Sequence, residues 1–197
     1  MPLLSIIGTA GRDGRMTAAV WQRVLLFLSA FIDSQAGLGI TLVSGGAAWI
    51  DHLAVRLFLL GKVSKLVLHL PCPFDRMKQR FVDTQNGETI SGQRSTGEYD
   101  WRINPGRTAN YYHDKFSKQL GSNSLAEIEL AIQKGATIYC YNGFHARNKE
   151  IAKTDLLLAF TWSTNDTPAD GGTKHTWDCC QTTSLGPNKV HYSLTQF

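Results

Sequence analysis

Short apolar runs alternate with longer amphipathic stretches over the first 70 residues of the chain. Three runs are short and almost wholly apolar, which predicts buried strands: 3–8, 40–43 and 65–70. Between them, residues 16–34 place Val20 and Val24 on one helical stripe, and residues 49–60 form a second apolar helix. Because a strand–helix–strand order favours right-handed crossovers, this segment predicts a parallel sheet.

The same alternation returns in the last third of the chain. Ser124 followed by Glu127 is the pattern of a capping box, which predicts a helix that begins at Ser124 and ends at Gly135. The other expected elements are strands at 137–141 and 155–161, an edge strand at 190–194, and helices at 149–154 and 173–182. Together they predict an α/β fold: one Rossmann-like, three-layer domain over residues 1–197, with a mostly parallel central sheet.

The middle of the chain, at about residues 73–122, lacks long apolar periodicity. Arginines and aromatic residues interleave there, as they do on surfaces that stack on single-stranded nucleic acid. Acidic residues such as Asp75, Asp83 and Asp114 offset most of that positive charge. We therefore expect an insertion, partly helical near 110–120, that covers the ligand face as a lid or forms a dimer surface.

Length and composition indicate a globular domain with a sizeable core. Of the 197 residues, 43% are hydrophobic and 18% are charged, and the net charge of +4 mildly favours anionic ligands. No apolar stretch is long enough to span a bilayer, and the first residues predict a strand and not a signal peptide. The four cysteines lack zinc-binding spacing, which favours reduced thiols, a cytoplasmic protein and no metal held by the chain.

Three glycine-containing turns follow three of the expected strands. Their residues are Gly8, Thr9 and Arg12; Ser44, Gly45 and Gly46; and Gly171, Gly172 and Thr173. Glycine lets the backbone approach an anion, and the first N–H groups of a helix attract phosphate. Because parallel strands end at one edge of a sheet, the turns predict a shared ligand site, although each is also explained as a simple tight turn. The first turn is not G-x-G-x-x-G, which argues against a standard NAD site.

Several polar side chains are candidates for ligand contacts. Arg147, followed by Asn148, can grip a phosphate through two parallel hydrogen bonds, and Arg12 can act as a second clamp. Lys174 can reach a phosphate, and His175 can donate to one or act as a general acid. Arg147, Lys174 and His175 each have a simpler interpretation as exposed residues on a turn or at a helix start.

Other side chains carry weaker signals. Asp51 opens a predicted helix, where the helix dipole alone favours an acid, but it can also bind a ribose hydroxyl or a metal. His113, in the insertion, is a candidate to close over a base. Trp162 and Trp177 flank the last glycine turn and either belong to the core or stack on a nucleobase.

Several stretches of the chain resemble known motifs. Residues 44–54 (Ser-Gly-Gly-Ala-Ala-Trp-Ile-Asp-His-Leu-Ala) resemble the S-G-G-A-x-G-I-D-x-x-A stretch of DprA-type DNA-processing proteins. Residues 143–152 and 155–160 are similar to the segment before the last glycine turn in that group, and residues 170–173 are similar to the P-G-G-x-G-T loop of LOG phosphoribohydrolases. In this order, the stretches resemble the SLOG superfamily of Rossmann-like nucleotide-binding domains, nearest to its YspA/YpsA-like branch.

The resemblance covers roughly residues 3–70 and 123–182, but two positions depart from the LOG pattern. Thr176 and Ala146 stand where LOG enzymes have glutamates. A carboxylate can stabilise the oxocarbenium-like state of N-glycosidic cleavage, so these replacements weaken the expectation of hydrolysis. The remaining candidate catalytic residues are Asp51, Glu127 and His175.

The sequence and the resemblance together predict binding of a nucleotide or nucleotide-derived small molecule, by a sensor, a sequestering protein or an enzyme. A nucleotide-processing hydrolase, such as a LOG-like N-glycosidase, is one alternative, and a DprA-like binder of single-stranded DNA is another. The resemblance and the apolar first helix predict a homodimer. No cofactor besides the nucleotide is expected to be required, and the use of Mg²⁺ is left open.

Overall fold

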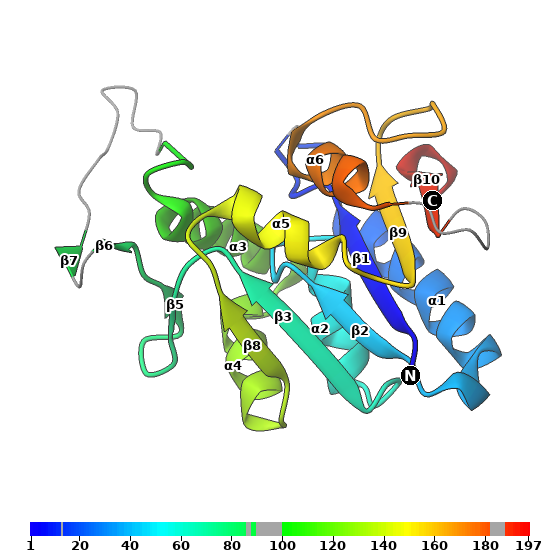
Figure 1. The fold of residues 1–197 in the computed structure, drawn as a ribbon, viewed down its shortest axis with the longest axis horizontal. Coiled ribbons are helices and arrows are strands. Elements are labelled where there is room, and N and C mark those ends of the chain that lie inside the picture. Colours follow the sequence, from blue (N-terminus) through cyan, green and yellow to red (C-terminus); the bar gives the residue numbers. More distant parts are fainter. Residues whose placement is uncertain (13, 86–87, 90–99, 182–187) are drawn as a thin grey trace.

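The main sheet is built from six parallel strands. The computed structural model of the chain describes residues 1–12, 14–85, 88–89, 100–181 and 188–197. The strands of the sheet are β1 (Leu3–Gly8), β2 (Thr41–Ser44), β3 (Lys65–Leu70), β8 (Thr137–Cys140), β9 (Leu156–Thr161) and β10 (Lys189–Ser193). They lie in the order β10-β9-β1-β2-β3-β8, and each neighbouring pair is parallel (Figure 1). This confirms the predicted parallel sheet, with β10 at one edge.

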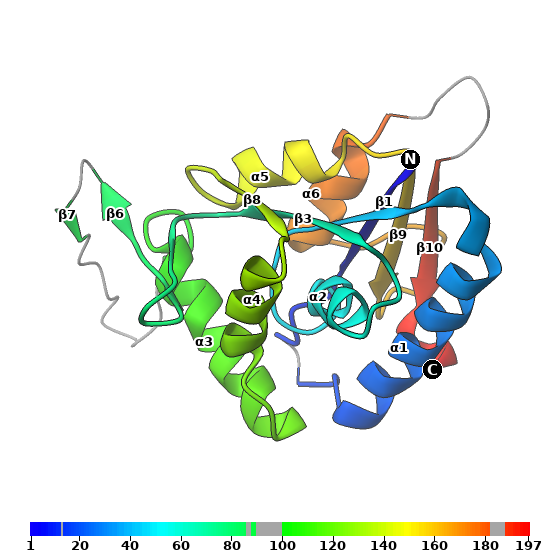
Figure 2. The ribbon, with the colours of Figure 1, turned by 90° about the horizontal axis from the view of Figure 1, so that it is seen from below.

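Helices cover both faces of this sheet. They are α1 (Ala18–Ser34), α2 (His52–Leu59), α3 (Pro105–Leu120), α4 (Ser124–Gln133), α5 (Phe144–Ile151) and α6 (Gly171–Cys179), with short 3-10 turns at Ala36–Leu38 and Leu194–Gln196. α1, α2 and α4 lie on one face and α5 and α6 on the other, and α3 packs against α4 (Figure 1, Figure 2). The helix–sheet–helix layers confirm the α/β, Rossmann-like class.

The chain changes direction across the sheet between β1 and β9. From β1 it moves through β2 and β3 to β8 along one side, and α5 then carries it back across the other face to β9 and β10 (Figure 1). As a result β1 leads into α1 on one face, whereas β9 leads into α6 on the opposite face. In open α/β sheets the carboxyl ends of two such strands bound a crevice in which ligands bind.

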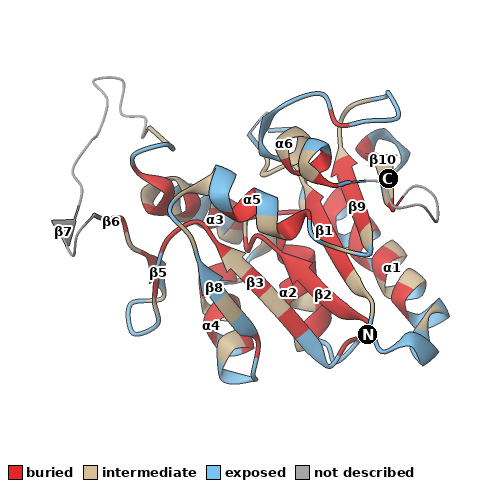
Figure 3. Ribbon diagram, in the orientation of Figure 1, coloured by how far each residue is buried: buried red, intermediate tan, exposed pale blue. Residues whose placement is uncertain are grey.

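The central strands are buried on both sides, which explains their continuous apolar sequence. Leu42, Leu158 and Phe160 are at most 1% exposed, and Figure 3 shows the buried positions gathered on β1, β2 and β9. A smaller apolar cluster lies under α5 and α6, and Trp177 is one of its buried members. Trp177 therefore belongs to the core, the first of its two sequence-based interpretations.

Two helix starts differ from the predictions for a local reason. The cap of α4 is Asn123, whose side chain accepts from the Ala126 N–H, so Ser124 is the first helical residue and the predicted capping box is wrong. The helix α5 begins at Phe144, five residues before the predicted start, because Gly143 takes a positive φ of 95° and turns the chain into it.

The bounds of α3 and α6 also differ from the predicted ones. α3 begins at Pro105 because the Asp83 carboxylate accepts from the N–H groups of Gly106 and Arg107, which caps a turn that apolar periodicity does not reveal. α6 runs over Gly171–Cys179, so the glycines form its first turn, and it ends before the predicted residue 182 because the backbone of Cys180 is extended.

The described part of the insertion forms two small hairpins and α3. The hairpins pair β4 (Phe74–Asp75) with β5 (Arg80–Phe81), and β6 (Thr84–Gln85) with β7 (Glu88–Thr89). Residues 86–87 and 90–99 of the predicted insertion lie outside the described residues. Among the described helices, none is long and apolar enough to cross a membrane. All four cysteines are free.

Candidate functional site

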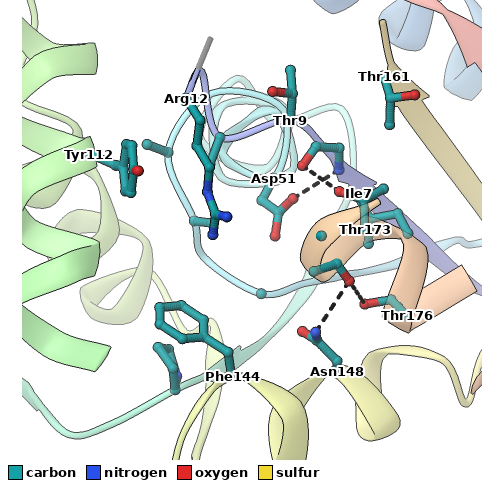
Figure 4. Close-up of a pocket in the computed structure, with 18 of the residues that line it drawn as sticks. Ile7, Thr9, Arg12, Asp51, Tyr112, Phe144, Asn148, Thr161, Thr173 and Thr176 are labelled. Atoms are coloured by element: carbon teal, nitrogen blue, oxygen red, sulfur yellow. Dashed lines mark hydrogen bonds between the residues drawn. The ribbon is translucent and has the colours of Figure 1, made fainter. Parts of the chain in front are cut away.

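A pocket of about 800 Å³ lies at the carboxyl ends of the strands. Its wall includes residues of all three glycine turns, the start of α5 and α6, and the residues that follow β9 (Figure 4). The pocket therefore sits where β1 and β9 lead to opposite faces of the sheet, the position expected for a ligand in this class of fold.

The first two turns are joined by Asp51. Its Oδ1 accepts from the Gly8 N–H at 3.1 Å, and its backbone carbonyl accepts from the Ser44 hydroxyl at 2.7 Å. Ser44 Oγ in turn accepts from the Gly46 N–H at 3.2 Å. Ser44 is fully buried and is not among the lining residues, so it shapes the second turn and does not face the cavity.

Glycine is required at two of these positions because neighbouring atoms leave no space for a side chain. A Cβ on Gly8 would overlap the Phe160 carbonyl oxygen and the Ile50 side chain. A Cβ on Gly45 would lie 2.8 Å from Asp51 Oδ2 and would also overlap the Arg147 guanidinium. The backbone of the two turns is therefore packed directly against the floor of the pocket.

The third turn places the start of α6 at the pocket. Asp170, at the N-cap, makes no capping bond through its side chain, so that side chain does not shield the first turn of α6. Thr173 Oγ1 donates to the Gly8 carbonyl at 2.8 Å, and Asn148 Nδ2 donates to the Gly172 carbonyl at 3.2 Å (Figure 4). These bonds tie the third turn to the first turn and to α5, as a shared site requires.

Arg147 is buried at the base of the pocket. Its guanidinium donates to the Gly45 carbonyl, and its Nε donates to Asn148 Oδ1 at 3.1 Å. Its Nη2 lies 3.9 Å from Asp51 Oδ2, and the guanidinium carbon lies 5.2 Å from the centre of the Phe144 ring. Arg147 lines the pocket but is committed to contacts within the protein, so it fixes the second turn as well as facing the cavity.

Asp51 brings a carboxylate into the pocket. Burial raises its pKa to about 6, and the nearby Arg147 and the N–H groups of Gly8, Ala47 and Gly45 oppose this rise. A buried carboxyl group that titrates near neutral pH can accept a hydrogen bond from a ribose hydroxyl or exchange a proton with a ligand.

Two arginines on the turn after β1 reach aromatic rings at the pocket wall. The Arg12 guanidinium lies 5.8 Å from the centre of the Tyr112 ring, and the Arg15 guanidinium lies 4.9 Å from the centre of the Trp162 ring. In Figure 4 the Arg12 side chain extends into the cavity. Arg15 and Tyr112 were not expected at the site, because only the fold brings α3 and the end of β9 next to the first turn.

The insertion supplies one wall of the pocket. Its contributions to the lining are Phe81, Trp101, Thr108, Ala109 and Tyr112. Phe144, at the start of α5, lies at the same end of the cavity as Tyr112, and its ring centre is 6.2 Å from that of Trp101 (Figure 4). This end of the pocket is therefore largely aromatic, whereas the end formed by the glycine turns exposes backbone.

Two candidate residues point away from the cavity. Glu127 binds His52 Nε2 at 2.8 Å and Arg56 Nε at 3.1 Å, between α4 and α2, and it is not among the lining residues. Lys174 Nζ pairs with the Asp178 carboxylate at 2.6 Å one turn along α6 and does not line the pocket either. Glu127 is thus placed as a structural partner of α2 and not as a catalytic group.

The histidines are also distributed differently from the predictions. His175 stacks on His145 with ring centres 4.3 Å apart, and only His145 lines the pocket. His113 is fully buried, and its Nε2 donates to the Gly46 carbonyl at 2.9 Å. Burial lowers the pKa of His113 to about 3. His113 therefore holds the second turn from beneath and is not placed to close over a base.

The two positions that replace glutamates differ in exposure. Thr176 lines the pocket, is 2% exposed, and its Oγ1 donates to the Gly172 carbonyl at 3.0 Å. Ala146 is exposed on α5 and is not part of the lining. The described residues contain no cluster of three or more histidine, cysteine or acidic side chains that could hold a metal ion.

Comparison with known proteins gives one informative relative. No protein-family model matches the chain, and no solved structure matches it. A protein of Acanthamoeba polyphaga mimivirus, named "Uncharacterized protein R261", is 31% identical to it over 184 residues, which cover 89% of this chain and 88% of the viral protein. Such an identity over nearly the whole of both proteins indicates common ancestry. The chain belongs to the family of this mimivirus protein.

Proposed function

We propose that the protein binds a nucleotide or a nucleotide-derived small molecule in the pocket at the carboxyl ends of β1, β2 and β9. The observation that carries this proposal is the meeting of three glycine turns and the start of α6 in one cavity of about 800 Å³. That volume lies within the roughly 300–1,000 Å³ usual for small-molecule sites.

The phosphate end of the ligand is matched by the glycine turns. The first turn of α6 contains Gly171 and Gly172 and has no side-chain cap, so it offers a helix N-terminus to an anion. The described lining residues include three arginines and two aspartates, so the pocket carries a net positive charge. Arg12 is the best placed to contact a phosphate directly, because its side chain enters the cavity (Figure 4).

The base end is matched by the aromatic wall. Tyr112 and Trp101 come from the insertion and Phe144 from α5, and all three line the pocket. Aromatic side chains stack on any nucleobase, so they favour a nucleotide over a simple phosphorylated metabolite. We also propose, from the motif resemblance and the Rossmann-like sheet, that the family is part of the SLOG superfamily.

Calorimetric titration with nucleoside mono-, di- and triphosphates tests this proposal. The Arg12→Ala variant should bind the best ligand at least about tenfold more weakly, because a hydrogen bond to a charged group is lost. Lys174→Ala is a matched control, since Lys174 is paired with Asp178 outside the pocket, and it should leave the affinity unchanged. Equal loss in both variants would contradict the proposed site.

A second candidate function is hydrolysis of the bound nucleotide. Asp51 favours it, because a buried carboxyl group with a pKa of about 6 in a ligand pocket is suited to donate a proton to a leaving base. Incubation of the best-bound nucleotide with the protein, followed by measurement of free base, separates binding from turnover. If the wild type releases free base and the Asp51→Asn variant does not, the protein is an enzyme. If neither releases base, the protein only binds the nucleotide.

A further inference from the structure

The pocket has two matching arginine–aromatic pairs, one on each side. Arg12 lies over Tyr112 of α3, and Arg15 lies over Trp162, which follows β9. All four residues line the cavity. In Figure 4 Tyr112 and Thr161, the neighbour of Trp162, stand on opposite sides of the cavity. Tyr112 is carried by α3 and Trp162 follows β9, so the two pairs belong to different walls of the cavity.

Each pair marks an aromatic face that accepts a flat group. A guanidinium plane and a nucleobase stack on aromatic rings in the same way. Trp162 is only partly buried, so its ring lines the cavity on one side while it packs against the core on the other.

We infer that the ligand is a dinucleotide, two nucleosides joined through a pyrophosphate, with one base on Tyr112 and the other on Trp162. This inference rests on the proposed nucleotide function and names the class of nucleotide. The pyrophosphate lies between the two rings, over the first and third glycine turns, where Arg12 and Arg15 flank it.

Size, charge and topology agree with this class of ligand. A pocket of about 800 Å³ stands near the upper end of the usual range of roughly 300–1,000 Å³, more than a single nucleoside monophosphate needs. The two negative charges of a pyrophosphate match a lining in which arginines outnumber aspartates. Ligands of doubly wound sheets lie in the crevice at the strand-order reversal, which here is the gap between β1 and β9; the turn after β1 lacks the NAD fingerprint, so the two aromatic rings take the place of that motif in the inference.

Calorimetry with matched ligands tests the inference. The probes are the symmetrical dinucleoside diphosphates of adenine, guanine, cytosine and uracil, each compared with the mononucleotide and the nucleoside diphosphate of the same base. For the preferred base, the dinucleotide should bind at least about tenfold more tightly than either smaller probe, because a second base stacks.

Two variants show whether both rings hold a base. Tyr112→Ala and Trp162→Ala should each weaken the dinucleotide about tenfold, whereas only one of them should weaken the mononucleotide. Tyr139→Ala is the matched control, since Tyr139 is exposed on β8 and does not line the pocket, and it should change nothing. Trp162→Phe keeps an aromatic face for stacking, so it should weaken the dinucleotide less than Trp162→Ala does. It tests the role of this ring even where the alanine variant folds poorly.

The outcomes separate the inference from the proposal beneath it. If a mononucleotide binds as tightly as its dinucleotide, or if both alanine variants weaken the mononucleotide equally, the dinucleotide class is wrong and nucleotide binding stands. If none of the probes binds at millimolar concentration, both the inference and the proposed function are wrong.

Discussion

Asp51 and Arg147 form the charged floor of the pocket and depend on each other. Both are buried, and their side chains approach to 3.9 Å while each also contacts a glycine turn. The pair does not fully offset the cost of burying a carboxylate, because the pKa of Asp51 is still raised to about 6. The pocket thus contains a carboxyl group that prefers to be protonated below neutral pH.

The first prediction follows from this raised pKa. As the pH rises from 3.8 to about 6, the unfolded chain loses the Asp51 proton while the folded chain keeps it, so the free energy of unfolding falls. Asp51→Asn keeps the shape and an acceptor for the Gly8 N–H but cannot ionise. Relative to this variant, the free energy of unfolding of the wild type should fall by up to about 3 kcal/mol between pH 4 and pH 7.

Urea unfolding of both proteins at several pH values measures this difference, and the other titrating groups cancel in it. The difference should be constant below about pH 3, and above about pH 7 it should level off again. If the free energies of unfolding of the two proteins change in parallel with pH over the whole range, the pKa of Asp51 is not raised in the folded protein.

The second prediction separates stability from binding at two glycines. Gly8→Ala forces a Cβ against the Phe160 carbonyl and should destabilise the fold by at least about 2 kcal/mol. A Cβ on Gly172 would meet only Asn148 Nδ2, at an ordinary 3.6 Å, so Gly172→Ala should leave stability equal or raise it by up to about 1 kcal/mol.

Thermal unfolding and calorimetric titration of the two glycine variants check this contrast. Gly172→Ala should nonetheless weaken nucleotide binding, because the proposed phosphate lies against the first turn of α6. A stable Gly172→Ala protein with unchanged affinity would remove this turn from the ligand site.

At the residue scale, the sequence could identify the glycine turns but not what surrounds them. The turns could be found because three of them follow predicted parallel strands, whereas Arg147 was placed beside them only by its match to a family motif. Lys174 and Glu127 carry the right chemistry at plausible positions, yet Lys174 pairs with Asp178 and Glu127 with Arg56. The partner of Glu127 lies 71 residues away in sequence, and that of Lys174 lies on its own helix, but apolar periodicity reveals neither pair.

At the scale of elements, α3 and α4 support the second glycine turn. His113 on α3 donates to the Gly46 carbonyl, and its Nδ1 lies 2.9 Å from the hydroxyl of Ser124, the first residue of α4. Because a carbonyl only accepts, the proton must be on Nε2, so the Ser124 hydroxyl donates to Nδ1. The insertion is thereby fastened to the pocket from beneath.

The third prediction concerns this support. Folding keeps His113 neutral, so its contribution is complete above pH 6.5 and falls as the unfolded chain binds a proton below that pH. His113→Leu removes this dependence and leaves the Gly46 carbonyl without its donor, which costs about 1–3 kcal/mol at pH 7. The stability difference between wild type and variant should therefore shrink by about 2 kcal/mol from pH 6.5 to pH 5.

Chemical denaturation at pH 7 and pH 5 measures that change. Ser117→Ala is a useful control, because Ser117 lies one step further along the same network and does not titrate. A difference between wild type and His113→Leu that stays constant with pH would mean that His113 is not held neutral in the folded protein.

The predicted elements succeed where periodicity is strong and fail at polar boundaries. The strand at 65–70 is matched at both ends by β3, because charge and proline flank a continuous apolar run. The early starts of α3 and α5 were missed because Asp83 caps α3 from a distance and Gly143 turns the chain in a way that its sequence neighbours do not encode.

At the scale of the whole molecule, the repeating strand–helix order was sufficient to predict the parallel sheet. The strand order was not predictable, because it depends on α5 crossing the sheet to place β9 beside β1. That crossing creates the crevice and brings the third glycine turn next to the first. The predicted homodimer stays a prediction, and light scattering at micromolar concentration tests it: a mass near twice 21.8 kDa supports it and a single-chain mass contradicts it.

The central claim, a nucleotide bound across the three glycine turns, is tested most directly by amide chemical shifts. A ¹⁵N-labelled sample is titrated with the best-binding nucleotide, and the shifts are assigned to residues. Saturable changes should concentrate on the N–H groups of Gly8 and Thr9, of Gly45 and Gly46, and of Gly171 and Gly172, with β10 unaffected. Changes confined to other surfaces, or no saturable change with any nucleotide, would contradict the account.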